Sequence, residues 1–363
     1  MSGAAAYFAQ SYAEARAGFL AAANLRGLAV ESALHPTRKG AQGEELAMDA
    51  ALAGAADAQA LLIVTSGTHG VEGFCGSGCQ RALLDDDDLF RRINAARIAV
   101  LLVHAINPHG FARLRRANED NIDLNRNFLD FSRPPAANAA YEELHELLLP
   151  AQWPPAEANL AALGVIRARV GERAFQAAVS SGQASRPNGL FYSGVAASWS
   201  NRTLRELVRR HGEGKRRVGW IDIHTGLGPS GHGEKIFAGR NDAADLARAR
   251  AWYGADVMSY YDGNSASAEV QGSATLSVYE ECPGAEIVAM GLEFGTQPLD
   301  AVVHALRGAH WLEIHPDASQ ALRAGIERSI RDAFYTDTDL WKGQILGQSR
   351  TALLQAVTSL AAV

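Results

Sequence analysis

The chain has 363 residues, of which 47% are hydrophobic and 20% charged, enough to form one large hydrophobic core or two modest ones. This composition excludes a disordered chain, a fibrous repeat and a small disulfide scaffold. The 34 Lys and Arg residues face 40 Asp and Glu residues, which gives a formal charge of -6. The basic excess that a nucleic-acid-binding surface requires is missing, so we expect no nucleic-acid partner.

Residues 1–25 predict an amphipathic helix, because Glu14 and Arg16 interrupt the apolar residues and the basic start of a secretory signal is missing. No run of about 18 apolar residues occurs, so we expect no membrane span. The 3 cysteines form an odd set in a large chain, which argues against a disulfide framework and favours a reducing compartment. The sequence therefore predicts a cytoplasmic protein and gives no indication of its oligomeric state.

Short apolar runs alternate with longer helical patterns along the chain. The runs are rich in Val, Ile and Leu, as is typical of strands covered on both faces. We expect strands at 60–65, 97–104, 218–224 and 287–294, and helices at 137–149, 160–179 and 200–211. This alternation predicts an α/β fold with a mostly parallel sheet. The proline-punctuated segment of about 130–215 is interpreted as a helical insertion in a single domain that spans 1–363.

Polar side chains follow three of these runs where each strand is expected to end. His69 and Glu72 lie in a glycine-flanked turn after the first run, and glycine lets the backbone bend sharply there. His224 and Glu293 lie at the ends of the third and fourth runs. Because open α/β sheets gather their ligands at the carboxyl ends of strands, we expect these side chains to meet at one edge. Two imidazoles and a carboxylate, with a further carboxylate as base, are the parts of a catalytic zinc site.

The segment after the second run adds groups suited to an anionic substrate. Arg116 and Arg126 lie there among asparagines, including Asn118 and Asn125. An arginine can hold a carboxylate by two parallel hydrogen bonds, a role that suits Arg126. Arg116 is placed to stabilise an oxyanion as it forms at an attacked carbonyl group.

Six short motifs carry a resemblance to a known enzyme family. They occur in the order HGVE (69–72), NPHG (107–110), RAN (116–118), DLNRNF (123–128), DIHTG (222–226) and LEFGT (292–296). Together they resemble the zinc carboxypeptidase family in the broad sense that includes the succinylglutamate desuccinylase and aspartoacylase branch. The resemblance covers about residues 60–300. It is closest to a bacterial branch known mainly as a domain of unknown function.

The resemblance implies a single three-layer αβα domain with a mixed, mostly parallel sheet. It also implies one zinc ion per chain and a hydrolase that cleaves an amide bond with a metal-activated water. The implied roles are zinc binding by His69, Glu72 and His224, general base catalysis by Glu293, oxyanion stabilisation by Arg116, and substrate carboxylate binding by Asn125 and Arg126.

Two departures from the family leave the substrate open. His109 stands where peptidases of this family usually carry aspartate, and no residue matches the substrate-capping tyrosine of the digestive carboxypeptidases. The expected partner is a peptide or an acylated amino acid with a free carboxylate. A carboxypeptidase-like enzyme is the first interpretation and an N-acyl amino acid deacylase of the aspartoacylase type is the alternative. A non-catalytic metal-containing binding protein is the third.

Other polar residues near the motifs have simpler interpretations. Asp222 lies two residues before His224, on the same face of the expected strand, and is placed to orient it. Cys75 and Cys79 are expected on the inner face of a helix that follows the ligand turn. Further candidate ligands are His104, His109 and His232, although one zinc is the simpler expectation.

Overall fold

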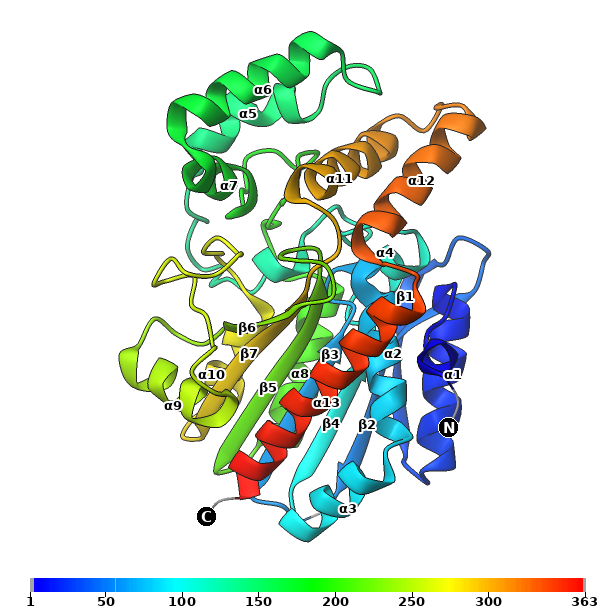
Figure 1. Cartoon of the computed structure of the whole chain (residues 1–363), viewed down its shortest axis with the longest axis vertical. Helices are drawn as coiled ribbons and strands as arrows, with labels where there is room; N and C mark the ends of the chain where they lie inside the picture. The colour runs from blue at the N-terminus through cyan, green and yellow to red at the C-terminus, as the bar shows by residue number, and fades with distance from the viewer. Residues whose placement is uncertain (1–2, 56, 362–363) are drawn as a thin grey trace.

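The computed structural model describes residues 3–55 and 57–361, and its centre is a seven-stranded mixed sheet (Figure 1). The strand order is β1-β2-β4-β3-β5-β7-β6. The central strands β4, β3, β5 and β7 are parallel, and β1 runs the same way because it is antiparallel to β2, which is antiparallel to β4. The strands are β1 (Val30–Lys39), β2 (Glu45–Gly54), β3 (Ala60–Ser66), β4 (Ala99–His104), β5 (Arg217–Thr225), β6 (Gly233–Phe237) and β7 (Glu286–Phe294).

Alternate side chains of the central strands enter two separate hydrophobic cores. In β3, Leu62 and Val64 belong to one core, whereas Leu61 and Ile63 belong to the other. This follows from the strand geometry, because successive side chains point to opposite faces of a sheet. Both faces are covered, which explains why these strands are continuously apolar in the sequence.

Helices cover the two faces of the sheet. One core includes side chains from α1, α2, α3, α9 and α13, and the other includes side chains from α8 and α10. The predicted three-layer α/β fold with a mixed sheet is therefore confirmed. These helices are α1 (Tyr12–Leu25), α2 (Gly73–Leu84), α3 (Asp87–Ala96), α8 (Trp199–Gly212), α9 (Ala243–Tyr253), α10 (Val278–Glu281) and α13 (Asp339–Ala361).

A group of helices lies beyond the carboxyl ends of the parallel strands, at the top of Figure 1. Side chains from all five of its helices form a hydrophobic cluster of their own. We call this group the helical lobe; its members are α5 (Ala139–Leu148), α6 (Glu157–Val170), α7 (Glu172–Ser180), α11 (Leu299–Ile314) and α12 (Gln320–Phe334). The remaining helices are α4 (Pro108–Ala112), η1 (Ala4–Tyr7), η2 (Gly70–Glu72), η3 (Leu124–Arg126) and η4 (Ala274–Ser277).

The structure corrects the predicted helical insertion in detail. A single helix over 160–179 is wrong, because Gly171 separates α6 from α7 with φ = 85°. The N–H of Gly171 closes α6 on the carbonyl of Arg167, and its own carbonyl accepts from Phe175 in α7. The helix expected at 200–211 is α8, which packs on the sheet, so within the segment of about 130–215 only α5, α6 and α7 belong to the lobe.

The four predicted strands correspond to β3, β4, β5 and β7 to within two residues at either end. The strands β1, β2 and β6 were not predicted, because their residues are less continuously apolar. Cys75 and Cys79 lie on α2 as buried free thiols, as the sequence indicated. Within the described ranges, no helix is both long and apolar enough to cross a bilayer.

We predict that His104 makes the stability of the protein depend on pH. Its buried ring lies 4.7 Å from the ring of Phe19, and its Nε2 lies 3.0 Å from Oγ of Ser77. Burial lowers the pKa of His104 to about 4, whereas an unfolded chain keeps a histidine pKa of about 6.5. Between these values the unfolded chain binds more protons, so the free energy of unfolding falls as the pH falls.

Between pH 7 and pH 4, the free energy of unfolding of the wild type should fall by about 3 kcal/mol more than that of His104→Gln, because glutamine does not titrate. Denaturant unfolding at a series of pH values measures this difference. The matched control is His232→Gln, since His232 is exposed, and it should keep the wild-type pH dependence. An unchanged pH dependence in the His104 variant would contradict the assignment.

Candidate metal centre and active site

The carboxyl ends of β3, β5 and β7 meet at one edge of the sheet and carry the predicted residues. In the parallel register of β5 and β7, His224 is aligned with Glu293. Beyond β3, the chain turns through Gly67, with φ = 64°, and reaches His69, which precedes η2. Glu72 is the last residue of η2. The strand ends thus bring the four polar side chains to one site, as the sequence indicated.

Position 70 requires a glycine because η2 packs directly on α4. A Cβ atom on Gly70 would lie 2.1 Å from the carbonyl carbon of Gly110. The N–H of Gly70 also donates to the carbonyl of Arg116 at 3.2 Å. This close approach fixes His69 relative to the loop that carries Arg116.

Glu72 lies between the two imidazoles. Its Oε1 is 2.8 Å from Nδ1 of His69, and its Oε2 is 2.9 Å from Nδ1 of His224. His69, Glu72 and His224 each offer one candidate ligand atom, and these three atoms lie within 4.8 Å of one another. All three residues are buried. Two imidazole nitrogens and a carboxylate form a donor set suited to zinc. Among the described residues, no other group of three such side chains has this spacing, and His104, His109 and His232 do not join it.

Each imidazole has a carboxylate at its outer nitrogen. Nε2 of His224 lies 2.8 Å from Oδ2 of Asp222, and Nε2 of His69 lies 3.2 Å from Oδ1 of Asp123. A carboxylate at Nε2 keeps the proton there and leaves the lone pair of Nδ1 for a cation. Asp222 is held in turn by the hydroxyl groups of Thr65 and Thr68, which donate at 2.7 and 2.9 Å.

The charges of the site also fit a divalent cation. Four carboxylates, those of Glu72, Asp123, Asp222 and Glu293, accompany two guanidinium groups, those of Arg116 and Arg126. Metal binding requires neutral imidazoles, and with all four carboxylates ionised the four negative and two positive charges then leave two negative charges in excess. A divalent cation balances that excess, and buried charges require such a partner.

The pKa shifts show how strongly the imidazoles and carboxylates of the site interact. Burial alone would raise the pKa of Glu72, yet His69 and His224 outweigh it and hold that pKa well below its usual range. Burial alone would lower the pKa of His224, but Asp222 and Glu72 raise it well above the usual value. Burial would likewise raise the pKa of Asp123, which Arg116, Arg126 and His69 lower. Glu72 and Asp123 are therefore ionised at neutral pH, and His224 holds a proton that a cation at its Nδ1 would displace.

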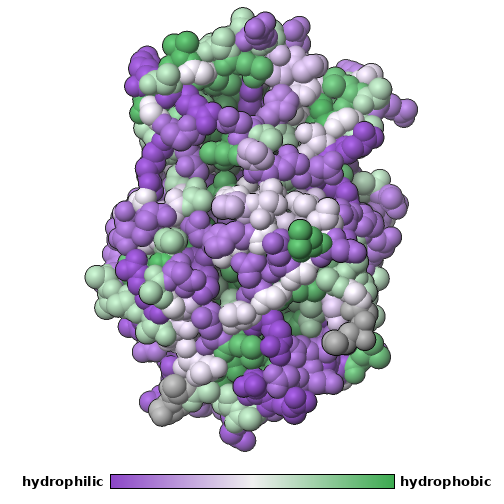
Figure 2. Space-filling model, viewed as in Figure 1, coloured by the Kyte–Doolittle hydropathy of each residue, from purple (hydrophilic) through white to green (hydrophobic). Residues whose placement is uncertain are grey.

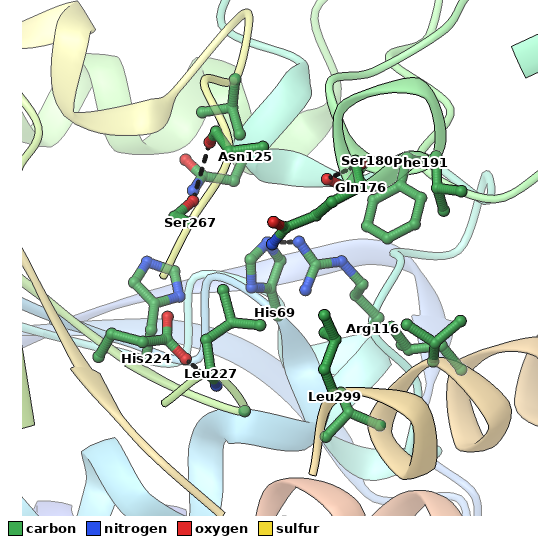
Figure 3. A pocket seen from close by; sticks show the side chains of 18 of the residues that line it. His69, Arg116, Asn125, Gln176, Ser180, Phe191, His224, Leu227, Ser267 and Leu299 are labelled. Atoms are coloured by element: carbon green, nitrogen blue, oxygen red, sulfur yellow. Dashed lines mark hydrogen bonds between the residues drawn. The ribbon is translucent and has the colours of Figure 1, made fainter. Parts of the chain in front are cut away.

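Arg116 lies against the candidate ligands (Figure 3). Its Nε donates to Oδ2 of Asp123 at 2.8 Å, and its Nη2 lies 2.7 Å from Nε2 of His69. The contact with Arg116 requires Nε2 of His69 to accept, whereas the contact with Asp123 requires it to donate. A cation at Nδ1 selects the second tautomer, which leaves the N–H groups on Nη2 of Arg116 available to another acceptor.

Glu293 lies in the same cavity as the cluster and is not part of it. Its Oε1 accepts from the N–H of Leu227 at 2.9 Å. Burial, together with the negative charge of Glu72, raises the pKa of Glu293 to about 8. A divalent cation at the neighbouring cluster favours the ionised form, because an opposite charge nearby lowers the pKa of a carboxyl group.

Asn125 and Arg126 lie on η3. Oδ1 of Asn125 accepts from the N–H of Ala274 at 3.0 Å. Nε of Arg126 donates to the carbonyl of Ser180 at 2.8 Å, its Nη2 donates to the same carbonyl, and its Nη1 donates to the carbonyl of Asn125 at 2.8 Å. Arginine has five N–H donors, so these contacts leave one N–H on each terminal nitrogen for a ligand.

A cavity of about 460 Å³ joins all of these residues, a volume typical of small-molecule sites. The sequence-predicted residues that line it are His69, Glu72, Arg116, Asn125, Arg126, His224 and Glu293. The structure thus brings all of them together, while their chemical roles stay predictions. His109 lies buried on α4 and does not line the cavity.

Sequence analysis missed two residues of the site. Asp123 begins the DLNRNF motif but was given no role, although a carboxylate before Asn125 and Arg126 was a visible signal. Tyr260 is buried and lines the cavity near Arg126. No motif surrounds Tyr260, so nothing in the sequence indicated it.

The fold is shared with carboxypeptidase A. The carboxypeptidase A of Helicoverpa armigera superposes with a TM-score of 0.52 at 13% identity, over 98% of this chain and 74% of that chain. Two looser matches are bovine thrombin-activatable fibrinolysis inhibitor (TM-score 0.45, 12% identity, 94% and 98% covered) and a protein of Shewanella amazonensis described provisionally as a metallopeptidase (TM-score 0.43, 16% identity, 83% and 91% covered).

The chain belongs to the family DUF2817, which is described as a protein of unknown function. The family model matches residues 8–348. This confirms the predicted resemblance to a bacterial branch with no assigned function. The comparison with curated proteins finds no significant match.

We predict that Gly70→Ala destabilises the protein by about 1–3 kcal/mol, because the added methyl group overlaps the backbone of Gly110 and neither backbone can yield cheaply. Thermal or denaturant unfolding measures the change. The matched control is Gly325→Ala on α12, where an added Cβ meets nothing within 4 Å, and this variant should be at least as stable as the wild type. Equal stability of the Gly70 variant and the control would show that η2 and α4 are not held in this contact.

Proposed function

We propose that the protein is a zinc-dependent hydrolase that cleaves an amide bond in the manner of a carboxypeptidase. The observation that carries the proposal is the arrangement of the cluster. Nδ1 of His69 and Nδ1 of His224 face the two oxygens of Glu72, each imidazole has a carboxylate at Nε2, and Glu293 and Arg116 line the same cavity. A purely structural zinc usually has four protein ligands, whereas three ligands and a neighbouring base are typical of catalysis.

His69, Glu72 and His224 would hold the zinc ion, which when bound supplies Lewis-acid activation of a water and of the scissile carbonyl. Glu293 takes a proton from the attacking water and later delivers it to the leaving amine. Arg116 donates hydrogen bonds to the oxyanion that forms at the attacked carbonyl. The C–N bond is thereby replaced by a carboxylic acid and an amine, at the expense of one water molecule.

Asn125 and Arg126 supply the proposed binding site for a carboxylate on the substrate. The N–H groups that remain on Nη1 and Nη2 of Arg126 suit the two oxygens of a carboxylate. Burial lowers the pKa of Arg126 to about 10, in spite of Asp123, so the guanidinium is still charged at neutral pH. A peptide with a free C-terminus and an N-acyl amino acid both carry such a group.

The two catalytic residues argue against the non-catalytic interpretation. A metal-binding protein without activity has no need of a buried carboxylate such as Glu293 beside the cluster, because burial of that group is costly.

The cytoplasmic location remains a prediction from the sequence.

The purified protein should contain about one zinc ion per chain, and His69→Ala should lose it, because one of three ligands is removed. Elemental analysis without added metal measures both. Asp222→Asn should retain the site but bind zinc about 10–100-fold more weakly, because the partner of His224 is altered. A wild-type protein that holds no metal and cannot be loaded would contradict the proposal.

Arg116→Ala should lower kcat about 100-fold, which corresponds to about 3 kcal/mol of barrier, while zinc stays bound. Glu293→Gln should abolish measurable turnover with zinc retained, because the amide cannot accept the proton. Amide hydrolysis and metal content are measured on the same samples. Arg328→Ala, at an exposed position on α12, is the matched control and should behave as the wild type. Loss of zinc in the Arg116 variant would contradict the role given to that residue.

A further inference from the structure

The cavity extends from the candidate metal centre into the helical lobe. The face of α6 that lines it carries Leu160, Leu163, Gly164 and Arg167, which follow the three- and four-residue spacing of one helical face. Figure 2 shows apolar side chains in the hollow between the upper helices and the rest of the molecule. Other apolar side chains of the lobe that line the cavity are Leu148, Phe175, Val179, Leu299, Val302 and Leu306. We call this apolar part of the cavity the lobe chamber.

The arginines of the lobe chamber already have hydrogen-bond partners within the protein. Arg167 on α6 donates to Asp300 on α11 at 2.6 Å and to Glu172 on α7 at 2.7 Å. Arg307 donates to the carbonyls of Leu147 and Leu148 at 2.8 and 2.9 Å. Arg167 is thus ion-paired, the donors of Arg307 are engaged by carbonyl groups, and most of the other lobe side chains that line the cavity are apolar.

Phe191 connects the lobe chamber with the candidate metal centre. Two arginines of the candidate site lie close to its ring. The guanidinium carbon of Arg116 is 5.0 Å from the ring centroid, and that of Arg126 is 5.5 Å from it. The ring also packs against the hydrophobic cluster of the lobe. In Figure 3, Phe191 and Leu299 lie on the side of His69 where Arg116 lies, away from His224.

The opposite part of the cavity has a different lining. It is formed by β6 and the chain that follows α9, with Ile236, Tyr260, Ser273 and Thr275 among its residues. Asn125 belongs to this part, because its side chain accepts from Ala274 at the start of η4. A ligand whose carboxylate lies at Asn125 and whose carbonyl lies at Arg116 therefore extends past Phe191 into the lobe chamber.

We infer that the lobe chamber binds a large apolar acyl group, so that the substrates are N-acyl amino acids whose acyl part is a medium or long aliphatic chain. The inference rests on the proposed function and names its substrate class. It follows from three observations: the chamber is continuous with the metal centre, its walls are mostly apolar, and its arginines have hydrogen-bond partners within the protein. Each methylene buried there strengthens binding by about fourfold at most.

The test compares N-acetyl-, N-hexanoyl- and N-decanoyl-leucine as substrates of the protein purified with its metal. The value of kcat/KM should rise at least tenfold from the acetyl to the decanoyl compound. Gly164→Trp fills the lobe chamber and should remove this rise, because Gly164 lines the chamber and an added Cβ meets nothing within 4 Å. Gly343→Trp is the matched control on α13, where the glycine is exposed and equally open, and should keep the rise.

A constant kcat/KM across the three compounds, or the same rise in the Gly164 variant, would overturn the inference. The melting temperature of each variant shows whether it is folded. Should Gly164→Trp unfold, Leu160→Trp takes its place, because Leu160 lies on the same face of α6 and is 46% exposed.

A second measurement separates this inference from the proposed function. If no compound is hydrolysed, the proposed function fails for N-acyl amino acids. Calorimetric titration with decanoate and acetate then tests, independently of catalysis, whether the lobe chamber binds an aliphatic chain. Binding of decanoate, but not acetate, by the wild type and by Gly343→Trp, with loss in Gly164→Trp, supports an apolar acyl site. Absence of decanoate binding by the wild type overturns it.

Discussion

The rest of the site depends on one buried carboxylate, that of Glu72. The side chain is 2% exposed, and an ionised group at such depth is stable only with strong partners. Each of its oxygens faces one imidazole, and the N–H of Thr225 donates to Oε2 at 3.2 Å. The parallel register of β3 and β5 supplies those partners from two neighbouring strand ends. The sheet thus stabilises the buried, ionised carboxylate of Glu72, because it holds the partner groups at fixed positions around it.

The sequence predicted the parts of the molecule that local patterns determine. The four central strands were visible because burial on both faces makes them continuously apolar. His69, Glu72, His224 and Glu293 were visible because each lies at or just beyond the end of such a strand, and parallel strands end at a common edge. The family and the three-layer fold were indicated by the order of the motifs, although identity to a carboxypeptidase of the same fold is only 13%.

The sequence could not predict what depends on contacts between distant segments. The carbonyl of Ser180 on α7 meets Arg126, 54 residues earlier, and no local pattern records that pairing. Tyr260 reaches the cavity from a segment without regular secondary structure. The break between α6 and α7 depends on a single glycine in a stretch that otherwise favours helix. The helical periodicity of that stretch therefore predicted one continuous helix.

The three-way ion pair of Arg167 with Glu172 and Asp300 fastens α6 to α7 and α11 at the rim of the cavity. Its side chains are 34%, 55% and 73% exposed, so water and salt compete for every contact. Exposed pairs of this kind contribute about 0–1 kcal/mol each. These ion pairs therefore weaken as ionic strength rises, whereas the apolar contacts that join the same three helices in the hydrophobic cluster of the lobe do not depend on charge.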